Sequence, residues 1–305
     1  MATDSPRPFV IPVRSSRPFR PPELSGGVAR VPTGVPDFDY LTGGLPAGSV
    51  VLLFGTAGAG HQEFALTSAV HLMLRWDDPR LHRFFLGQAK GPFSYPQSVI
   101  YLSTSRSREQ MIGEMRGAFD GVYSTVLDRH LIFGDLSSAY FADTVVPASW
   151  SSVPRPLLAA TTAPAPPTEG PLRALADAID GIEGNQLVIL DSLTDLLVRR
   201  GVESSDVLAL LKGLRRRAKE WGGLVYVVLS EGVAPAPVEQ AVLDSVDGVL
   251  HFSWLASATS SHRQRAMLIE KFMPVLARLP VEHQGRFVIQ VNSKSGLVTT
   301  QYERV

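Results

Sequence analysis

The chain contains 305 residues with 29 basic and 29 acidic side chains, so its formal net charge of zero argues against a surface that coats nucleic acid throughout. It has no cysteine, which excludes dependence on disulfides, and no apolar stretch approaches the ~18 residues of a membrane span. The N-terminus lacks the apolar core of a secretory signal, so a cytoplasmic location is the default expectation.

Residues 1–30 are rich in proline and arginine. They hold six prolines and five arginines against two acids, with little hydrophobic periodicity. This composition predicts a flexible arm, followed by one domain at 31–305. The arm is either a plain solvated tail or a basic contact to nucleic acid or a neighbouring subunit.

From residue 31 the chain alternates between apolar runs and amphipathic segments. This alternation is typical of an α/β fold with a mostly parallel twisted sheet and helices on both faces. Strands are expected near 50–54, 98–103, 131–134, 187–191, 224–229 and 248–252, helices near 62–75, 107–119, 171–181 and 204–220, and paired antiparallel strands over 266–300. Two segments have the composition of insertions, 77–97 and the proline-rich 143–171.

A glycine-rich turn at 55–62 joins the first long strand to its helix. Its glycines, Gly55, Gly58 and Gly60, fit the frame of a phosphate-binding P-loop, G-x-x-x-x-G-K-[ST]. In such a loop the backbone N–H groups wrap the phosphates, the lysine contacts the terminal phosphates, and the hydroxyl holds Mg²⁺. Here His61 and Gln62 stand at the lysine and hydroxyl positions.

These two replacements remove the side chains that would contact the terminal phosphates and Mg²⁺. The neutral imidazole of His61 supplies no fixed positive charge near pH 7, and the amide of Gln62 is a poor Mg²⁺ ligand. Tight ATP binding by the usual route is therefore not expected, and ATP or ADP with Mg²⁺ would bind weakly. We therefore interpret this segment as a vestigial phosphate loop made of Gly55, Gly58, Gly60, His61 and Gln62. The alternative is a glycine-rich turn that binds no ligand.

A second element of the same kind of site is the strand that ends at Asp191. The apolar run Leu187–Leu190 stops on this acid, as a Walker B strand does where its aspartate faces Mg²⁺. Because ligands of parallel sheets sit outside the carboxyl ends of strands, Asp191 and the glycine loop are expected to converge on one crevice. Asp191 is thus the candidate metal ligand, if Mg²⁺ binds at all.

Cations gather at the end of the predicted helix 204–220. Arg215, Arg216, Arg217 and Lys219 lie in its last turns, where positive charge complements the helix dipole. Contact with nucleic acid is the alternative role.

The run from Thr33 to Ser49, TGVPDFDYLTGGLPAGS, resembles the lead-in of the KaiC-like branch of the RecA/RadA superfamily, T-G-[IV]-P-x-[LF]-D-x-L-x-G-G-[LI]-P-x-G-S. The resemblance extends over 31–300, outside the arm and the two insertions. It implies a RecA-like ATPase fold, and relatives that assemble as rings or filaments with ATP between subunits.

The resemblance also shows where this chain departs from an active ATPase. Relatives place a pair of glutamates that polarise the attacking water where Ser105 and Arg106 stand. They often carry a Lys-x-Arg that reaches the neighbouring subunit's phosphates, where Lys271 is kept and Met273 replaces the arginine. Arg106 is also a candidate compensating cation for the missing lysine.

These departures together predict a non-catalytic, pseudo-ATPase protein with a regulatory or scaffolding role. Its expected partners are further copies of itself or an active RecA/KaiC-like paralogue. Two alternatives stay open: a slow or unconventional ATPase that uses Asp191 with His61 or Arg106, and a DNA-binding module of the recombinase-paralogue kind that uses the arm and Arg215–Arg217.

Overall fold

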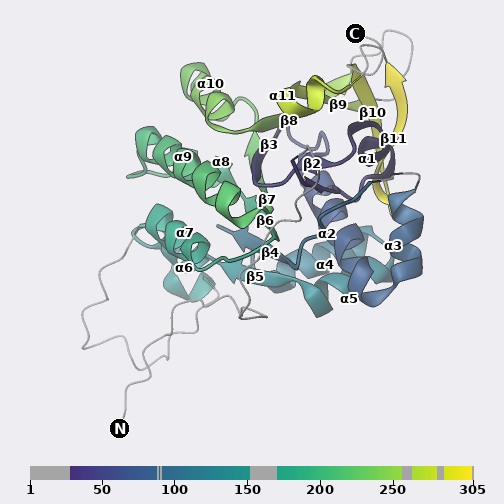
Figure 1. Cartoon of the computed structure of the whole chain (residues 1–305). Helices are drawn as coiled ribbons and strands as arrows, with labels where there is room; N and C mark the ends of the chain where they lie inside the picture. Colours follow the sequence, from purple (N-terminus) through teal and green to yellow (C-terminus); the bar gives the residue numbers. More distant parts are fainter. Residues whose placement is uncertain are drawn as a thin grey trace.

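The computed structural model describes residues 28–87, 89, 91–151, 170–255, 263–279 and 285–303. Within these residues the centre of the molecule is a nine-stranded sheet in the order β11-β10-β9-β8-β3-β7-β6-β4-β5 (Figure 1). Strands β8, β3, β7, β6, β4 and β5 run parallel, and β9, β10 and β11 are antiparallel. The strands are β3 (Ser49–Gly55), β4 (Ser98–Ser103), β5 (Ile132–Asp135), β6 (Gln186–Asp191), β7 (Leu224–Ser230), β8 (Gly248–Leu255), β9 (Gln264–Lys271), β10 (Arg286–Asn292) and β11 (Gly296–Glu303).

Helices cover both faces of this sheet. The helices are α1 (Pro36–Thr42), α2 (His61–Asp77), α3 (Pro79–Leu86), α4 (Arg108–Ala118), α5 (Gly121–His130), α6 (Ser137–Phe141), α7 (Pro171–Asp180), α8 (Leu193–Val198), α9 (Ser204–Trp221), α10 (Ala236–Ser245) and α11 (Met273–Leu276), with a 3₁₀ turn at Ala148–Trp150. Two buried hydrophobic clusters lie between the layers: one packs the sheet against α1–α5, and the other packs it against α7–α10. Because both faces are covered, the central strands are continuous apolar runs.

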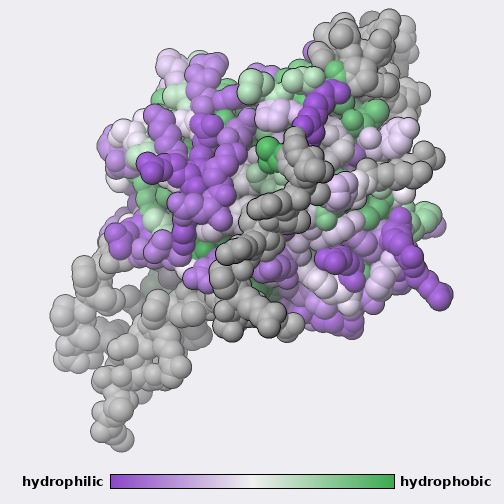
Figure 2. Space-filling view, in the orientation of Figure 1, coloured by the Kyte–Doolittle hydropathy of each residue, from purple (hydrophilic) through white to green (hydrophobic). Residues whose placement is uncertain are grey.

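The predicted α/β fold is confirmed, and so are the expected strands and the four expected helices, within a few residues at their ends. The expected antiparallel pairing after 266 is confirmed as β9, β10 and β11. Helix α9 illustrates why such patterns predict well: Val207, Leu211 and Leu214 are buried, and its outer face is hydrophilic (Figure 2).

The segment 77–97, expected to be an insertion, contains helix α3 packed into the core. Asp78 caps this helix by accepting hydrogen bonds from the backbone N–H groups of Arg80 and Leu81 at 2.9 and 3.0 Å. Phe85 is buried and stacks on His71 of α2, with 4.0 Å between ring centroids. This helix was not predicted, because its period is visible over only two turns.

Most of the second expected insertion, 152–169, lies outside the described residues, as do residues 1–27 of the arm. The last residues of the predicted arm belong to the domain. Arg30 pairs with Pro46 in the two-stranded sheet of β1 (Arg30–Val31) and β2 (Leu45–Pro46), and its guanidinium donates to the carbonyls of Thr42 and Gly44 at 3.2 and 2.9 Å. Within the described chain, no helix is both long and apolar enough to cross a membrane.

Candidate functional site: the carboxyl edge of the sheet

The glycine loop leaves the carboxyl end of β3 and enters α2, as predicted. Gly58 and Gly60 have φ of +71° and +119°, values that favour glycine whether or not a phosphate binds. The loop is braced from β8: the backbone carbonyl of Phe252 accepts from the N–H of Thr56 at 3.3 Å, and the indole of Trp254 donates to the carbonyl of Ala57 at 3.2 Å.

His61, at the lysine position, faces the protein rather than solvent. His61 is 4% exposed, and its ring centroid lies 6.3 Å from that of Phe252. Its buried Nδ1 has no hydrogen-bond partner among the described residues. Burial lowers the pKa of His61 below its usual range, against a smaller opposing effect of Glu63 and Asp191. The imidazole is therefore neutral at pH 7 and brings no charge to the loop.

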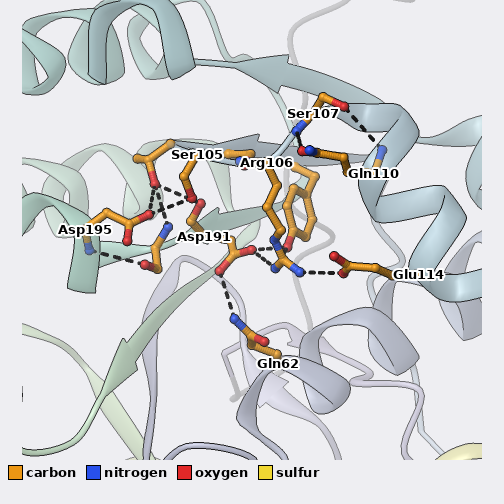
Figure 3. A network of polar contacts seen from close by, with 12 residues as sticks. Gln62, Ser105, Arg106, Ser107, Gln110, Glu114, Asp191 and Asp195 are labelled. Carbon is orange, nitrogen blue, oxygen red and sulfur yellow. Dashed lines mark hydrogen bonds and ion pairs between the residues drawn. The ribbon is translucent and has the colours of Figure 1, made fainter. Parts of the chain in front are cut away.

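Asp191 ends β6 beside the loop, so the predicted convergence occurs. Its side chain is 5% exposed and is occupied by donors from the chain itself (Figure 3). The hydroxyl of Tyr101 donates to Oδ2 at 2.5 Å, and the guanidinium of Arg106 contacts the same oxygen. The amide Nε2 of Gln62 lies 3.5 Å from Oδ1, which joins the start of α2 to the end of β6.

Arg106 is held in this position from several sides. Its Nη1 pairs with Glu114 of α4 at 3.0 Å, its Nη2 also reaches the hydroxyl of Tyr101 at 3.1 Å, and its backbone N–H donates to Ser103 Oγ at 2.9 Å. Burial lowers the pKa of Arg106, but Tyr101 and Asp191 raise it by more, so the net shift is upward. The guanidinium is thus a permanent charge beside Asp191.

Ser105 and Arg106, at the two positions where relatives place glutamates, contact different partners. Ser105 Oγ donates to Asp195 Oδ2 at 3.0 Å, and Thr104 Oγ1 donates to the same oxygen at 2.5 Å. A serine that donates to a carboxylate and an arginine paired with two carboxylates do not act as general bases at neutral pH.

Lys271 lies at the opposite edge of the sheet, because it pairs with Val249 at the start of β8. The ammonium of Lys271 donates to the backbone carbonyls of Leu243, Asp244 and Val246 at 2.8, 3.0 and 2.9 Å, where it caps the end of α10. All three of its donors are used within the chain. Met273, at the start of α11, is 78% exposed.

The sequence did not identify several residues of this site. Tyr101 reads as one more apolar position of a buried strand, and Glu114 as an ordinary helix acid. His251 and Trp254 of β8 show no metal-ligand spacing in the sequence. In the structure the ring nitrogens of His251 lie 3.2 and 3.3 Å from carboxylate oxygens of Glu231 and Glu270.

No group of three His, Asp or Glu side chains with the geometry of a metal site occurs within the described residues. Trp254, besides its bond to the loop, lies 5.0 Å from the guanidinium of Arg265.

The arginines at the end of α9 divide between two environments. Arg215 pairs with Asp247 at 3.1 Å, and Arg217 pairs with Glu220 at 2.9 Å. Arg216 is exposed. Two of the three arginines thus form ion pairs within the domain.

No family model matches the sequence, and no curated protein matches it. Solved structures do match its fold. One is a KaiC-like protein from the hyperthermophilic archaeon Pyrococcus horikoshii, with a TM-score of 0.58 at 16% identity over 90% of this chain and 100% of that chain. The chain has the RecA-like fold of the KaiC-like proteins. The flagellar accessory protein FlaH from Methanocaldococcus jannaschii is also similar, with a TM-score of 0.54 at 15% identity over 90% of this chain and 100% of that chain.

A RecA-like ATPase fold implies Mg²⁺ and a nucleotide at the glycine loop, and the residues of this RecA-like domain do not fit them. The lysine position carries a buried neutral imidazole, and the hydroxyl position carries an amide. The carboxylate that would face Mg²⁺ already accepts from Tyr101 and Arg106. Replacing those donors with a metal requires Arg106 to leave.

Proposed function

We propose that this RecA-like protein is non-catalytic and acts as a regulatory or scaffolding subunit. In this role it associates with further copies of itself or with an active RecA/KaiC-like paralogue, and the site at the carboxyl edge of its sheet does not turn over ATP. In such an assembly the protein provides a folded RecA-like domain that other subunits can bind.

The environment of His61 carries this proposal. Phosphoryl transfer depends almost wholly on positioning and electrostatic stabilisation, and the lysine of a P-loop supplies a large part of the charge. A buried imidazole with a lowered pKa leaves the loop with backbone N–H groups alone. Those groups and the helix dipole attract an anion only weakly without a free cation beside them, and Arg106 is already paired with Asp191 and Glu114.

A slow ATPase that uses Asp191 with His61 or Arg106 has less support. Asp191 accepts from Tyr101 and Arg106, so its Oδ2 is not available to a metal while Arg106 stays in place. No side chain at the positions of Ser105 and Arg106 can remove a proton from water at neutral pH.

Calorimetric titration with ATP and with ADP, each with Mg²⁺, tests the proposal. We expect the wild-type protein to give no binding heat, which places its dissociation constant above about 1 mM. A His61→Lys/Gln62→Thr double variant restores the charge and the hydroxyl, and we expect it to bind at least about tenfold more tightly than the wild type, equivalent to ~1.4 kcal/mol.

His61→Gln/Gln62→Thr is the matched control, because it restores the hydroxyl without the charge and should bind like the wild type. Micromolar ATP binding by the wild-type protein, with turnover that Asp191→Asn abolishes, would instead establish an unconventional ATPase.

Self-association is expected to involve exposed apolar side chains such as Met273. Burying a methionine side chain in an interface contributes ~1.5 kcal/mol or more, and a charge at its place opposes burial. Met273→Glu should therefore weaken self-association by about tenfold or more in sedimentation equilibrium. A change at the exposed Lys212 of α9, Lys212→Glu, is the control for added negative charge. A wild-type protein that stays monomeric at all concentrations would leave a paralogue as the partner to test.

A further inference from the structure

We propose that Arg106 is a built-in counter-ion that occupies the position of a divalent cation at Asp191, so that removing Arg106 turns this carboxylate into a Mg²⁺ or Mn²⁺ site. This inference rests in part on the proposed function. It extends that function from the absence of ATP turnover to the exclusion of the metal ion that ATP would bring. It is tested by a metal titration that needs no nucleotide.

The first support is the occupancy of Asp191. Its Oδ2 accepts from the hydroxyl of Tyr101 and from the guanidinium of Arg106. Tyr101 is fully buried, and burial together with Asp191 raises its pKa, so its hydroxyl remains a donor. Mg²⁺ binds proteins through one or two carboxylates and several waters, with its oxygen ligands at about 2.1 Å, and the guanidinium in contact with Oδ2 excludes it.

The second support is electrostatic. A carboxylate that is 5% exposed needs a positive partner to remain ionised at low cost, and the guanidinium is the cation in contact with it. Arginine keeps its charge at every physiological pH. The ion pair therefore satisfies Asp191 without any metal, and a metal can enter only by displacing it.

The third support is the way the backbone positions Arg106. Its N–H is bonded to Ser103 at the end of β4, and the next residue, Ser107, begins α4 with a reciprocal capping box to Gln110 (Figure 3). Glu114, one to two turns into α4, holds the outer side of the guanidinium at 3.0 Å. Arg106 is thus fixed between β4 and α4, unlike a surface arginine at a helix start.

Electron paramagnetic resonance of Mn²⁺, which counts the free ion, measures the predicted site in the full-length protein. We expect Arg106→Ala to bind one Mn²⁺ at least tenfold more tightly than the wild type, and Mg²⁺ to raise its melting temperature more than NaCl of equal ionic strength does. Arg106→Ala/Asp191→Asn should lose both effects. Arg108→Ala, which removes the surface partner of Asp128, is the control and should behave like the wild type.

Arg106→Gln keeps the volume of the side chain and replaces Arg106→Ala if the alanine variant does not fold. Wild-type protein that binds Mn²⁺ as tightly as the folded Arg106 variants, through Asp191, would overturn the role of Arg106. Folded Arg106 variants that gain no metal binding would overturn it as well. ATP binding by the wild type without a metal would contradict the absence of binding heat expected under the proposed function, but not the counter-ion role of Arg106.

Discussion

Replacing Gly55 with alanine is expected to destabilise the protein by about 3 kcal/mol, although the substitution adds a single methyl group. A Cβ atom at Gly55 would lie 2.5 Å from the backbone oxygen of Phe252 and 2.8 Å from its Cβ. Gly55 ends β3, which is paired on both sides, with β7 and with β8. Backbone held in the middle of a sheet cannot move aside, so the clash is not relieved. Urea unfolding at pH 7 measures the loss.

Gly213→Ala is the matched control. Gly213 lies on the exposed side of α9, and a Cβ atom there meets nothing within 4 Å. Alanine in a helix is favoured over glycine, so this variant should be more stable than the wild type by ~0.5–1 kcal/mol. If Gly55→Ala were as stable as the wild type, the first glycine of the loop would have to be explained by ligand binding rather than by packing.

The second large effect is an acid sensitivity that comes from His71. This histidine of α2 is 1% exposed; its Nδ1 donates to the carbonyl of Gly34 at 2.6 Å, and its Nε2 accepts from the hydroxyl of Tyr123 at 2.9 Å. Burial lowers the pKa of His71 to about 4 from 6.5, with a smaller opposing effect of the bond to Gly34. The folded protein thus keeps a neutral imidazole down to about pH 4.

The sign follows from linkage. Above pH 6.5 both the folded and the unfolded forms hold a neutral His71, so it contributes no pH dependence. Between pH 6.5 and about 4, His71 is protonated in the unfolded chain but neutral in the folded protein, so the free energy of unfolding falls as the pH falls. The full loss amounts to ~3 kcal/mol.

Urea unfolding of the wild type and of His71→Gln at pH 7 and pH 4 isolates this effect. Glutamine can donate to Gly34 and accept from Tyr123, but it does not titrate. We expect the wild type to lose ~3 kcal/mol more than the variant over this range. The comparison removes the contribution of Asp39, because both proteins contain it. Burial raises the pKa of Asp39 to about 7, which acts in the opposite direction. Equal losses would mean that His71 is protonated in the folded state.

Much of the fold could be predicted because each central strand is apolar along its whole length. The runs that became β3, β6 and β7 are buried on both faces, so their hydrophobicity alone located them within about a residue. Helix α3 escaped prediction because a two-turn helix has too few positions to define a period. Its place depends on contacts such as Phe85 on His71, which no local pattern encodes.

The same contrast divides the candidate site. The convergence of Gln62 and Asp191 could be predicted, since parallel strands direct their carboxyl ends to one edge. The partner of Asp191 could not be assigned: the sequence makes Arg106 a candidate cation for the missing lysine, and its contact with Asp191 depends on how α4 starts. The contacts of Lys271 with the carbonyls at the end of α10 could not be predicted either, because they join residues 25 to 28 positions apart in the chain.

By itself, the sequence determined the alternation of strands and helices and the glycine loop without lysine or hydroxyl, because both depend on residues close together in the chain. Its resemblance at 33–49 indicated the RecA-like fold. Only the tertiary structure decided that His61 is buried and neutral, and that Asp191 is satisfied by Arg106 and Tyr101. The contacts of Asp191 join residues that lie 85 to 129 positions apart in the chain. Their effect on charge arises only when folding removes water from between them.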